Sequence, residues 1–218
     1  MFTESESCKE TAPLGKSMPL MKSRLALCCS VLLLHASAVP AAQPRSWVDE
    51  IHVGVLAHDV HFAGGVEHGP DLNVELVFKS PVTPSRSRSM PLRSLLTPHP
   101  ALGVDINTAG DTSQLYVEEV WALSTQIPAP FNAIGLGRKR IFFHLGIGGA
   151  LNNGKRYSAD PDRKSLGSNA LFHASLEAGL QLTSHTDISL YFDHSSNAGL
   201  SRYNESLNDA GVRIGRRF

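Results

Sequence analysis

A histidine and a serine two residues apart suggest hydrolytic chemistry in this 218-residue chain. His194 and Ser196 have the parity of the apolar residues Ile188, Leu190 and Phe192 in the segment that precedes them. In a strand, residues two apart lie side by side on one face. An imidazole in that position can take the proton of the serine hydroxyl. The pair therefore has the residue types and the spacing of a nucleophile and its general base.

The last segment of the chain offers a third polar group on the same kind of face. Asn208 shares the parity of Val212, Ile214 and Phe218. If the two segments are neighbouring strands, the Asn208 amide oxygen can accept the second imidazole N–H and fix the tautomer. The same pattern also fits a polar girdle, in which a histidine and a serine near a membrane interface are hydrated by lipid headgroups. The H-x-S spacing is common by chance, so it leaves both interpretations open.

Alternation of apolar and polar residues dominates the chain after residue 47 and predicts strands. We expect about eight of them, centred on the segments 47–62, 72–79, 102–106, 114–124, 140–148, 172–182, 187–193 and 208–218. The fourth fits least well, because Glu119 shares the parity of its apolar residues. A soluble sandwich or a lipocalin-like barrel would alternate in the same way.

Three further features favour a membrane barrel. An export signal precedes the strands, several strands reach the roughly 10 residues that cross a bilayer at a tilt, and the chain ends on the strand GVRIGRRF. No apolar run beyond residue 47 reaches the ~18 residues of a transmembrane helix. We therefore predict an all-β fold, an eight-stranded antiparallel transmembrane β-barrel of the outer membrane. A barrel of this size has room inside for side chains only, so a pore is not expected.

The first 41 residues have the pattern of an N-terminal extension and a signal peptide. Lys22 and Arg24 precede an apolar run at 25–34, and small residues follow it up to Ala38 and Ala41, the two candidate cleavage positions. Residues 42–218 are then the barrel.

Composition excludes several classes of protein. The chain carries 20 basic and 20 acidic residues, which argues against a nucleic-acid partner. A hydrophobic fraction of 42% argues against wholesale disorder. The cysteines, Cys8, Cys28 and Cys29, all precede the expected mature start, so the barrel can form neither a disulfide nor a cysteine metal site. We expect no metal and no cofactor.

The C-terminal segment 194–218, HSSNAGLSRYNESLNDAGVRIGRRF, resembles the signature of the lipid A 3-O-deacylase (PagL) family. Segments 99–121 and 144–155 are also similar to that family. The resemblance implies an outer-membrane barrel that binds lipid A, the anchor of lipopolysaccharide in the outer leaflet. It also implies hydrolysis of the acyl ester at the 3-position, with release of a 3-hydroxy fatty acid.

The resemblance also implies roles for individual residues. Ser196 would be the nucleophile and His194 the base. The groups that would bind the oxyanion or the substrate are Asn197, Asn204 and the backbone around Ala198 and Gly199.

This chain departs from the family at one position of the site. The acidic third member of the family's triad maps by spacing onto Asn208. An amide can orient His194 but carries no charge to stabilise an imidazolium. Glu205 or Asp209 could substitute, although Asp209 has the other parity. We expect an active enzyme in which Asn208 orients the histidine.

Other polar residues admit simpler interpretations. The segments 149–168 and 197–207 should be external loops, and the segment 80–100 should be periplasmic. The histidines that precede residue 70 and a nearby aspartate are expected to be interface or lumen groups and not a metal site: His52, His58, His61 and His68 with Asp59. The polar residues of inward parity are expected to fill the lumen: Asp105, His144, His173 and Glu177. The basic residues of the longer external loop either bind lipid A phosphates or are ordinary loop charges: Lys155, Arg156, Arg163 and Lys164.

The sequence leaves three matters open. A structural or adhesive barrel that has lost turnover would show the same alternation and no ester hydrolysis. A periplasmic lipid-binding β-barrel would fractionate as a soluble protein. A homodimer formed through the lipid-facing belt is possible, and nothing in the sequence decides for or against it.

Overall fold

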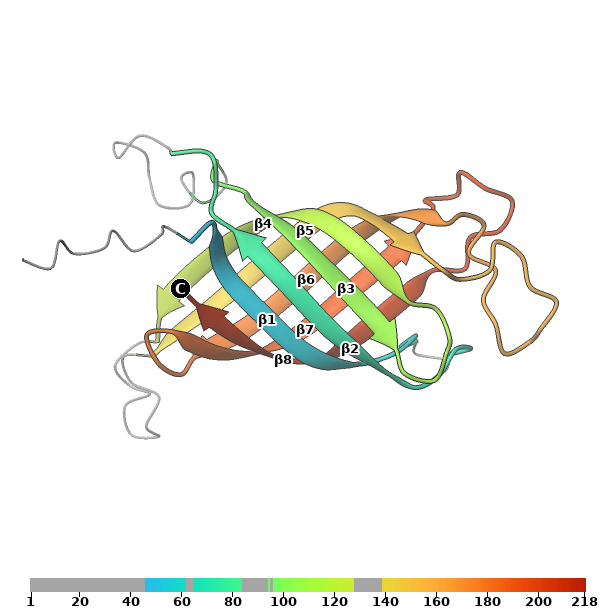
Figure 1. The fold of residues 1–218 in the computed structure, drawn as a ribbon, viewed down its shortest axis with the longest axis horizontal. Coiled ribbons are helices and arrows are strands. Elements are labelled where there is room, and N and C mark those ends of the chain that lie inside the picture. The colour runs from blue at the N-terminus through green and yellow to red at the C-terminus, as the bar shows by residue number, and fades with distance from the viewer. Residues whose placement is uncertain (1–45, 62–64, 84–93, 95, 128–138) are drawn as a thin grey trace, which may run out of the picture. The chain divides into compact units, whose positions relative to one another are not determined.

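The computed structural model describes residues 46–61, 65–83, 94, 96–127 and 139–218. Eight strands close into one antiparallel barrel in which each strand pairs with its neighbours in sequence and β8 pairs with β1 (Figure 1). The strands are β1 (Val48–Ala57), β2 (Pro70–Phe78), β3 (His99–Asn107), β4 (Gln114–Gln126), β5 (Arg140–Asn152), β6 (Ala170–Gln181), β7 (Thr186–Ser196) and β8 (Leu207–Arg217). The predicted fold class is confirmed.

The strand bounds differ from the expected ones mainly at the ends. β1 stops at Ala57, and residues 58–61 form part of a connection that becomes important below. No helix among the described residues is long and apolar enough to cross a membrane. The predicted signal segment 1–41 and most of the segment 80–100 lie outside the described residues.

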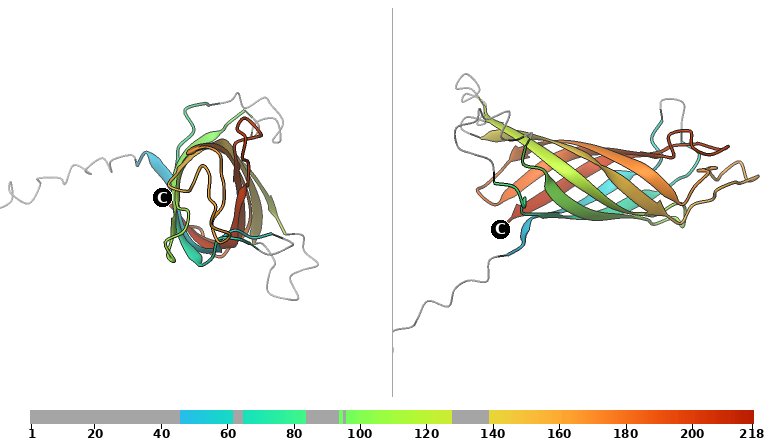
Figure 2. Two further views of the ribbon diagram at one scale, coloured as in Figure 1. Left: turned by 90° about the vertical axis from the view of Figure 1, so that its right-hand side faces the viewer. Right: turned by 90° about the horizontal axis from the view of Figure 1, so that it is seen from above.

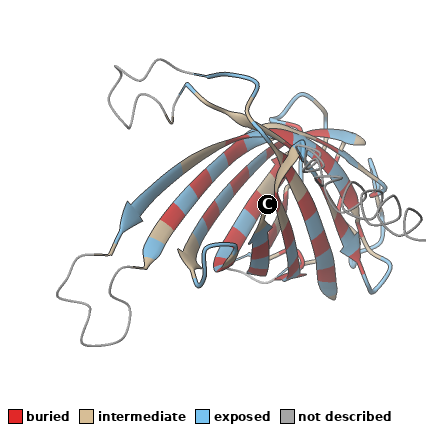
Figure 3. Ribbon diagram, turned by 60° about the vertical axis from the view of Figure 1, so that its left-hand side comes forward, coloured by how far each residue is buried: buried red, intermediate tan, exposed pale blue. Residues whose placement is uncertain are grey.

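Parity separates the two faces of the wall, as the alternating colours of Figure 3 show. Along β7, Asp193 and Ser195 are buried in the barrel, whereas Leu190 and Phe192 are exposed on its outer surface. Glu119 of β4, the residue with the unexpected parity, also lies on the exposed outer face. The apolar side chains therefore form an outer belt, and the polar ones fill the interior.

The interior is filled by paired charges. Arg213 of β8 is 1% exposed and donates to Glu75 Oε2 and to Glu177 Oε2, at 3.0 Å each. Its guanidinium also lies 3.9 Å from the centre of the Tyr191 ring. The remaining inward-facing residues named from the sequence, Asp105, His144, His173 and Glu177, are all buried. The lumen is thus a packed polar core, as expected of eight strands.

The start of β1 and the C-terminus lie at the same end of the barrel, where Phe218 N donates to Asp49 O at 2.9 Å. The opposite end, called the loop end here, carries the connections 58–69, 108–113, 153–169 and 197–206 (Figures 1 and 2). These loops bind one another: Glu205 N donates to Ser165 O at 3.2 Å. The loop end is therefore a structured cap, and the last residues of β7 lie directly beneath it.

Candidate active site

Strand register brings together the three residues that parity had placed on one face. His194 of β7 and Asn208 of β8 are direct cross-strand partners. His194 Nδ1 lies 2.7 Å from Asn208 Oδ1, and His194 Nε2 lies 3.1 Å from Ser196 Oγ. The predicted contacts among His194, Ser196 and Asn208 are present, on the outer face of the barrel near the loop end.

The distances define one consistent direction of hydrogen bonding. An amide oxygen can only accept, so His194 Nδ1 carries the proton that bonds to Asn208. Nε2 is then free to accept the Ser196 hydroxyl proton. Asn208 therefore holds the imidazole in the tautomer in which Nε2 can accept a proton.

Two residues that sequence reasoning did not assign to the site extend this chain of contacts. Asn208 Nδ2 lies 3.2 Å from His61 Nε2, and His61 Nδ1 lies 3.0 Å from Asp59 Oδ1. The connection is pinned there because Val60 N donates to Asn208 O at 2.7 Å. The pairing of β1 with β8 could have indicated this contact. Ala57 pairs with Ala210, and continuing that register brings the residues after Ala57 beside Asn208.

The proposed oxyanion groups have unequal roles. Asn197 is 3% exposed, and its Nδ2 donates to Leu166 O at 2.8 Å and to Tyr203 O at 2.6 Å. Its backbone N donates to Asn204 Oδ1 at 3.0 Å. Asn197 and Asn204 thus hold the turn after β7 in place, and their part in binding the oxyanion or the substrate stays a prediction.

The turn after β7 leaves one backbone donor available. Gly199 N donates to Asn197 Oδ1 at 2.9 Å, which commits that amide. Ala198 follows Asn197 with φ 54°, a left-handed conformation that is rare for a residue with a Cβ. No acceptor among the described residues bonds to the Ala198 N–H. The Ala198 amide is therefore the candidate oxyanion donor of this turn.

The two acidic alternatives to Asn208 are engaged elsewhere. Glu205 Oε2 accepts a hydrogen bond from Ser165 N in the neighbouring loop. Asp209 is fully buried and faces the lumen, where its Oδ1 accepts from Asp59 N at 2.9 Å. The inward orientation of Asp209 agrees with its parity. The position beside His194 Nδ1 belongs to Asn208 alone among the three candidates.

Comparison with known proteins identifies the family. A family model described as lipid A 3-O-deacylase (PagL) matches residues 99–217, which is more than half of the chain. The chain belongs to the lipid A 3-O-deacylase family. It is accordingly an outer-membrane enzyme and a carboxylic ester hydrolase.

The fold of this deacylase agrees with that assignment. A crystal structure of the outer membrane enzyme PagL superposes with a TM-score of 0.56 at 19% identity, covering 78% of this chain and 99% of that chain. At that identity, the likeness concerns the fold. The curated proteins include no match. The outer-membrane assignment excludes the periplasmic lipid-binding barrel.

Two hollows flank the hydrogen-bonded residues Ser196, His194 and Asn208 of this deacylase. One, of about 480 Å³, is lined by Val60, His61, Phe192 and Asn208. The other, of about 560 Å³, lies across β6 and the turn after β7, and its lining includes Arg156, Phe172, Asn197, Leu200 and Ser201. Apolar and polar groups meet in both hollows. That mixture suits a substrate with a sugar head and acyl chains.

The structure separates the four basic residues of the loop 153–169. Lys164 is 4% exposed and forms an ion pair with Asp59. Arg163 Nη1 donates to Asp111 Oδ1 at 2.7 Å. These two charges therefore hold the loops together. Lys155 and Arg156 are exposed, and Arg156 lines the second hollow with its Nε bonded to Asn169 Oδ1 at 2.7 Å.

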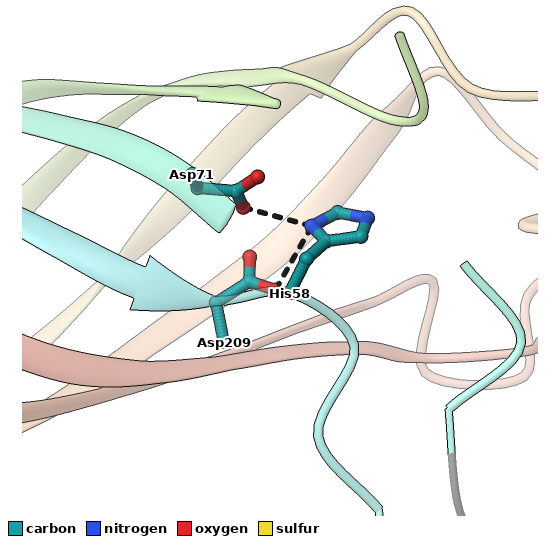
Figure 4. A group of neighbouring side chains, drawn as sticks. All are labelled: His58, Asp71 and Asp209. Carbon is teal, nitrogen blue, oxygen red and sulfur yellow. Dashed lines mark hydrogen bonds and ion pairs between the residues drawn. The ribbon is translucent and has the colours of Figure 1, made fainter. Parts of the chain in front are cut away.

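A histidine surrounded by carboxylates lies just inside the loop end, and Figure 4 shows it with two of them, Asp71 and Asp209. His58 Nδ1 lies 2.8 Å from Asp71 Oδ2 and 3.2 Å from Asp209 Oδ1, and its Nε2 lies 3.2 Å from Glu67 Oε2. Burial by itself would lower the pKa of His58, but the hydrogen bonds to these carboxylates outweigh it and raise the pKa to about 12. Both ring nitrogens of His58 are thus paired with carboxylates.

The other acidic group of the lumen is made by Asp105, Asp193 and Asp209. Gln114 Nε2 lies 3.1 Å from Asp105 Oδ2, 3.4 Å from Asp193 Oδ1 and 3.5 Å from Asp209 Oδ2. Asp193 and Asp209 are the inward neighbours in sequence of His194 and Asn208. This cluster therefore supports the inner side of the wall that carries the active site.

Proposed function

We propose that this deacylase hydrolyses the 3-position acyl ester of lipid A with Ser196 as nucleophile and His194 as general base, and releases a 3-hydroxy fatty acid. The observation that carries the proposal is the hydrogen-bonded row Ser196–His194–Asn208, with contacts of 3.1 and 2.7 Å, on the lipid-facing side of the barrel. An ester of an outer-leaflet lipid reaches this row without entering the lumen.

The first half of the reaction forms an acyl-enzyme. Ser196 Oγ attacks the ester carbonyl while His194 Nε2 takes the hydroxyl proton. The Ala198 N–H donates to the developing oxyanion, a kind of contact whose removal lowers kcat by about 10²–10³ in other hydrolases. As the tetrahedral intermediate collapses, His194 returns its proton to the departing 3-oxygen of the sugar. The acyl group then remains on Ser196.

The second half reverses these roles with water. His194 Nε2 takes a proton from water, and the hydroxide attacks the acyl carbonyl. Collapse of the second tetrahedral intermediate releases the 3-hydroxy fatty acid and returns the proton to Ser196. The residues present are sufficient for both halves.

The two hollows orient the substrate in this proposal. The acyl chain lies along the apolar outer belt of β7 and β8, where Leu190 is 68% exposed and Ile214 is 61% exposed. The sugar and its phosphate lie toward the hollow lined by Arg156. Guanidinium groups bind phosphate through paired hydrogen bonds, and of the four loop cations Arg156 is the one that lines this hollow.

Arg156→Ala is therefore expected to raise KM for lipid A by about tenfold, the loss of one charge-assisted contact, with little change in kcat. Initial rates over a range of substrate concentrations measure both constants. Lys79→Ala, which removes an exposed charge at the opposite end of the barrel, is the control. An equal KM effect on a substrate from which the phosphates have been removed would contradict the assigned contact.

The proposed reaction is tested by its product. Purified protein in detergent micelles is incubated with lipopolysaccharide, and the released acids are identified by mass spectrometry. We expect a single class of product, 3-hydroxy fatty acids. Release of acids without a hydroxyl group would place the cleaved ester elsewhere on lipid A. Absence of any release from correctly folded protein would favour the structural barrel without turnover.

A further inference from the structure

The third residue of the proposed site, Asn208, is neutral. It therefore supplies no negative charge of its own to stabilise His194 when the histidine is protonated. We propose that Asp59 and His61 complete the site as positioning residues, supplying through Asn208 the negative charge that an acidic residue beside His194 would provide. This inference rests on the proposed function, since it assigns partners to the same histidine.

The geometry gives a continuous row of polar contacts from Ser196 to Asp59. The Asn208 amide accepts from His194 with Oδ1 at 2.7 Å and donates to His61 Nε2 at 3.2 Å. Because His61 Nε2 accepts, the ring proton is on Nδ1, which lies 3.0 Å from Asp59 Oδ1. The hydrogen bonds from Ser196 through His194 and Asn208 therefore all run toward His61, and the Asp59 carboxylate lies in charge contact with the far side of that ring.

Asp59 is held firmly in place by its neighbours. It is 1% exposed, and its Oδ2 accepts from Val66 N at 2.7 Å and from Glu67 N at 3.1 Å. Lys164 forms an ion pair with its Oδ1. The backbone of Asp59 has φ 51°, a left-handed conformation that aspartate tolerates better than most residues.

Polar contacts in a row polarise one another. When His194 takes the Ser196 proton, it becomes a cation bonded to Asn208 Oδ1. The Asp59 charge, acting through His61, increases the negative character of that oxygen. Asp59 and His61 thereby favour the protonated histidine of the transition state without touching the ester.

We expect the Asp59 charge to affect kcat and not KM. Removal of the directly bonded acid of a serine triad costs about 10⁴ in kcat, and a charge two groups further away should cost about tenfold. We expect His61→Ala and Asp59→Asn each to lower kcat about tenfold while KM changes little. His68→Ala, which removes an exposed histidine of the same connection, is the matched control and should behave as wild type.

A substitution at Asn208 separates positioning from a merely structural role. Asn208→Glu, or Asn208→Asp if the longer side chain prevents folding, places a carboxylate beside His194 and makes the relay unnecessary. In that background, His61→Ala should cost less than about twofold, since the two changes are strongly coupled. Heat-modifiable migration on gels confirms that each variant is a folded barrel.

The outcomes distinguish this inference from the proposed function. If His61→Ala costs as much in the Asn208→Glu background as in wild type, His61 only supports the loop and the inference is overturned. If Ser196→Ala is inactive but His61→Ala and Asp59→Asn match wild type, the relay fails and the proposed function stands. If Ser196→Ala keeps its activity, the proposed function fails first.

Discussion

Ser196→Ala is expected to reduce the rate of lipid A deacylation to background, a loss of about 10⁶ in kcat by analogy with serine hydrolases that lose their nucleophile. The reason is that Ser196 Oγ, 3.1 Å from His194 Nε2, is the one hydroxyl group recorded in contact with His194 or Asn208 among the described residues. Release of 3-hydroxy fatty acid from lipopolysaccharide by purified protein measures the effect. The barrel itself should fold normally, because the substitution removes one oxygen from the outer face.

Ser195→Ala is the control that tests the assignment of faces. Ser195 is fully buried in the lumen, where its Oγ donates to Gln114 Oε1 at 2.7 Å and lies 3.0 Å from His173 Nδ1. The loss of these bonds should lower the free energy of unfolding by about 1–3 kcal/mol. Hydrolysis by the folded fraction should continue at the wild-type rate. Inactivation by Ser195→Ala together with survival of Ser196→Ala would reverse the two faces of β7.

Arg213→Met is expected to lower the free energy of unfolding by about 3–5 kcal/mol, the usual cost of removing one partner from a buried ion pair. Arg213 bonds both Glu75 and Glu177 at 3.0 Å, so the substitution leaves two buried carboxylates without their cation. Unfolding by urea in detergent micelles, followed by tryptophan fluorescence, measures the change.

Two further variants show whether the lost ion pairs are responsible. Arg216→Met removes an exposed arginine from the same strand and should leave stability within about 0.5 kcal/mol of wild type. Adding Glu75→Gln and Glu177→Gln to Arg213→Met should recover part of the loss, because neutral side chains are less costly to bury. Wild-type stability of Arg213→Met alone would show that the lumen charges do not depend on this residue.

Alternation predicted the strands and their faces, and the export signal, the strand lengths and the last strand were needed to predict a membrane barrel. A period of two assigns every residue of a strand to one face, and closure of the sheet leaves few ways to pair eight short strands. Parity therefore placed His194, Ser196 and Asn208 together on the outer face, and the pairing of β7 with β8 confirmed their contact.

Loops obey no such period, and there the sequence was less informative. The position of His61 depends on the left-handed backbone of Asp59 and on the bond from Val60 N to Asn208 O. These are tertiary features that no local pattern encodes. For the same reason, no pattern indicated that the Asn197 side chain, expected to bind the oxyanion, would bond to Leu166 O and Tyr203 O.

The basic loop shows the limit of reading charge from sequence. Lys155, Arg156, Arg163 and Lys164 were equivalent candidates for phosphate binding. Burial of Lys164 against Asp59 and the pairing of Arg163 with Asp111 commit two of them to the protein. Which cation remains available depends on where acidic residues of other loops fold, and that is set by the barrel as a whole.

The central claim is that Ser196 attacks the 3-position ester of lipid A. Its most direct test is mass spectrometry of lipid A recovered after incubation with wild-type protein or with the Ser196→Ala variant. We predict that wild-type protein removes one 3-hydroxyacyl group, with fragmentation placing the new hydroxyl at the 3-position of the sugar, and that the variant leaves lipid A intact. Loss of the same acyl group with the folded Ser196→Ala variant, or loss from any other position with wild type, would contradict the account.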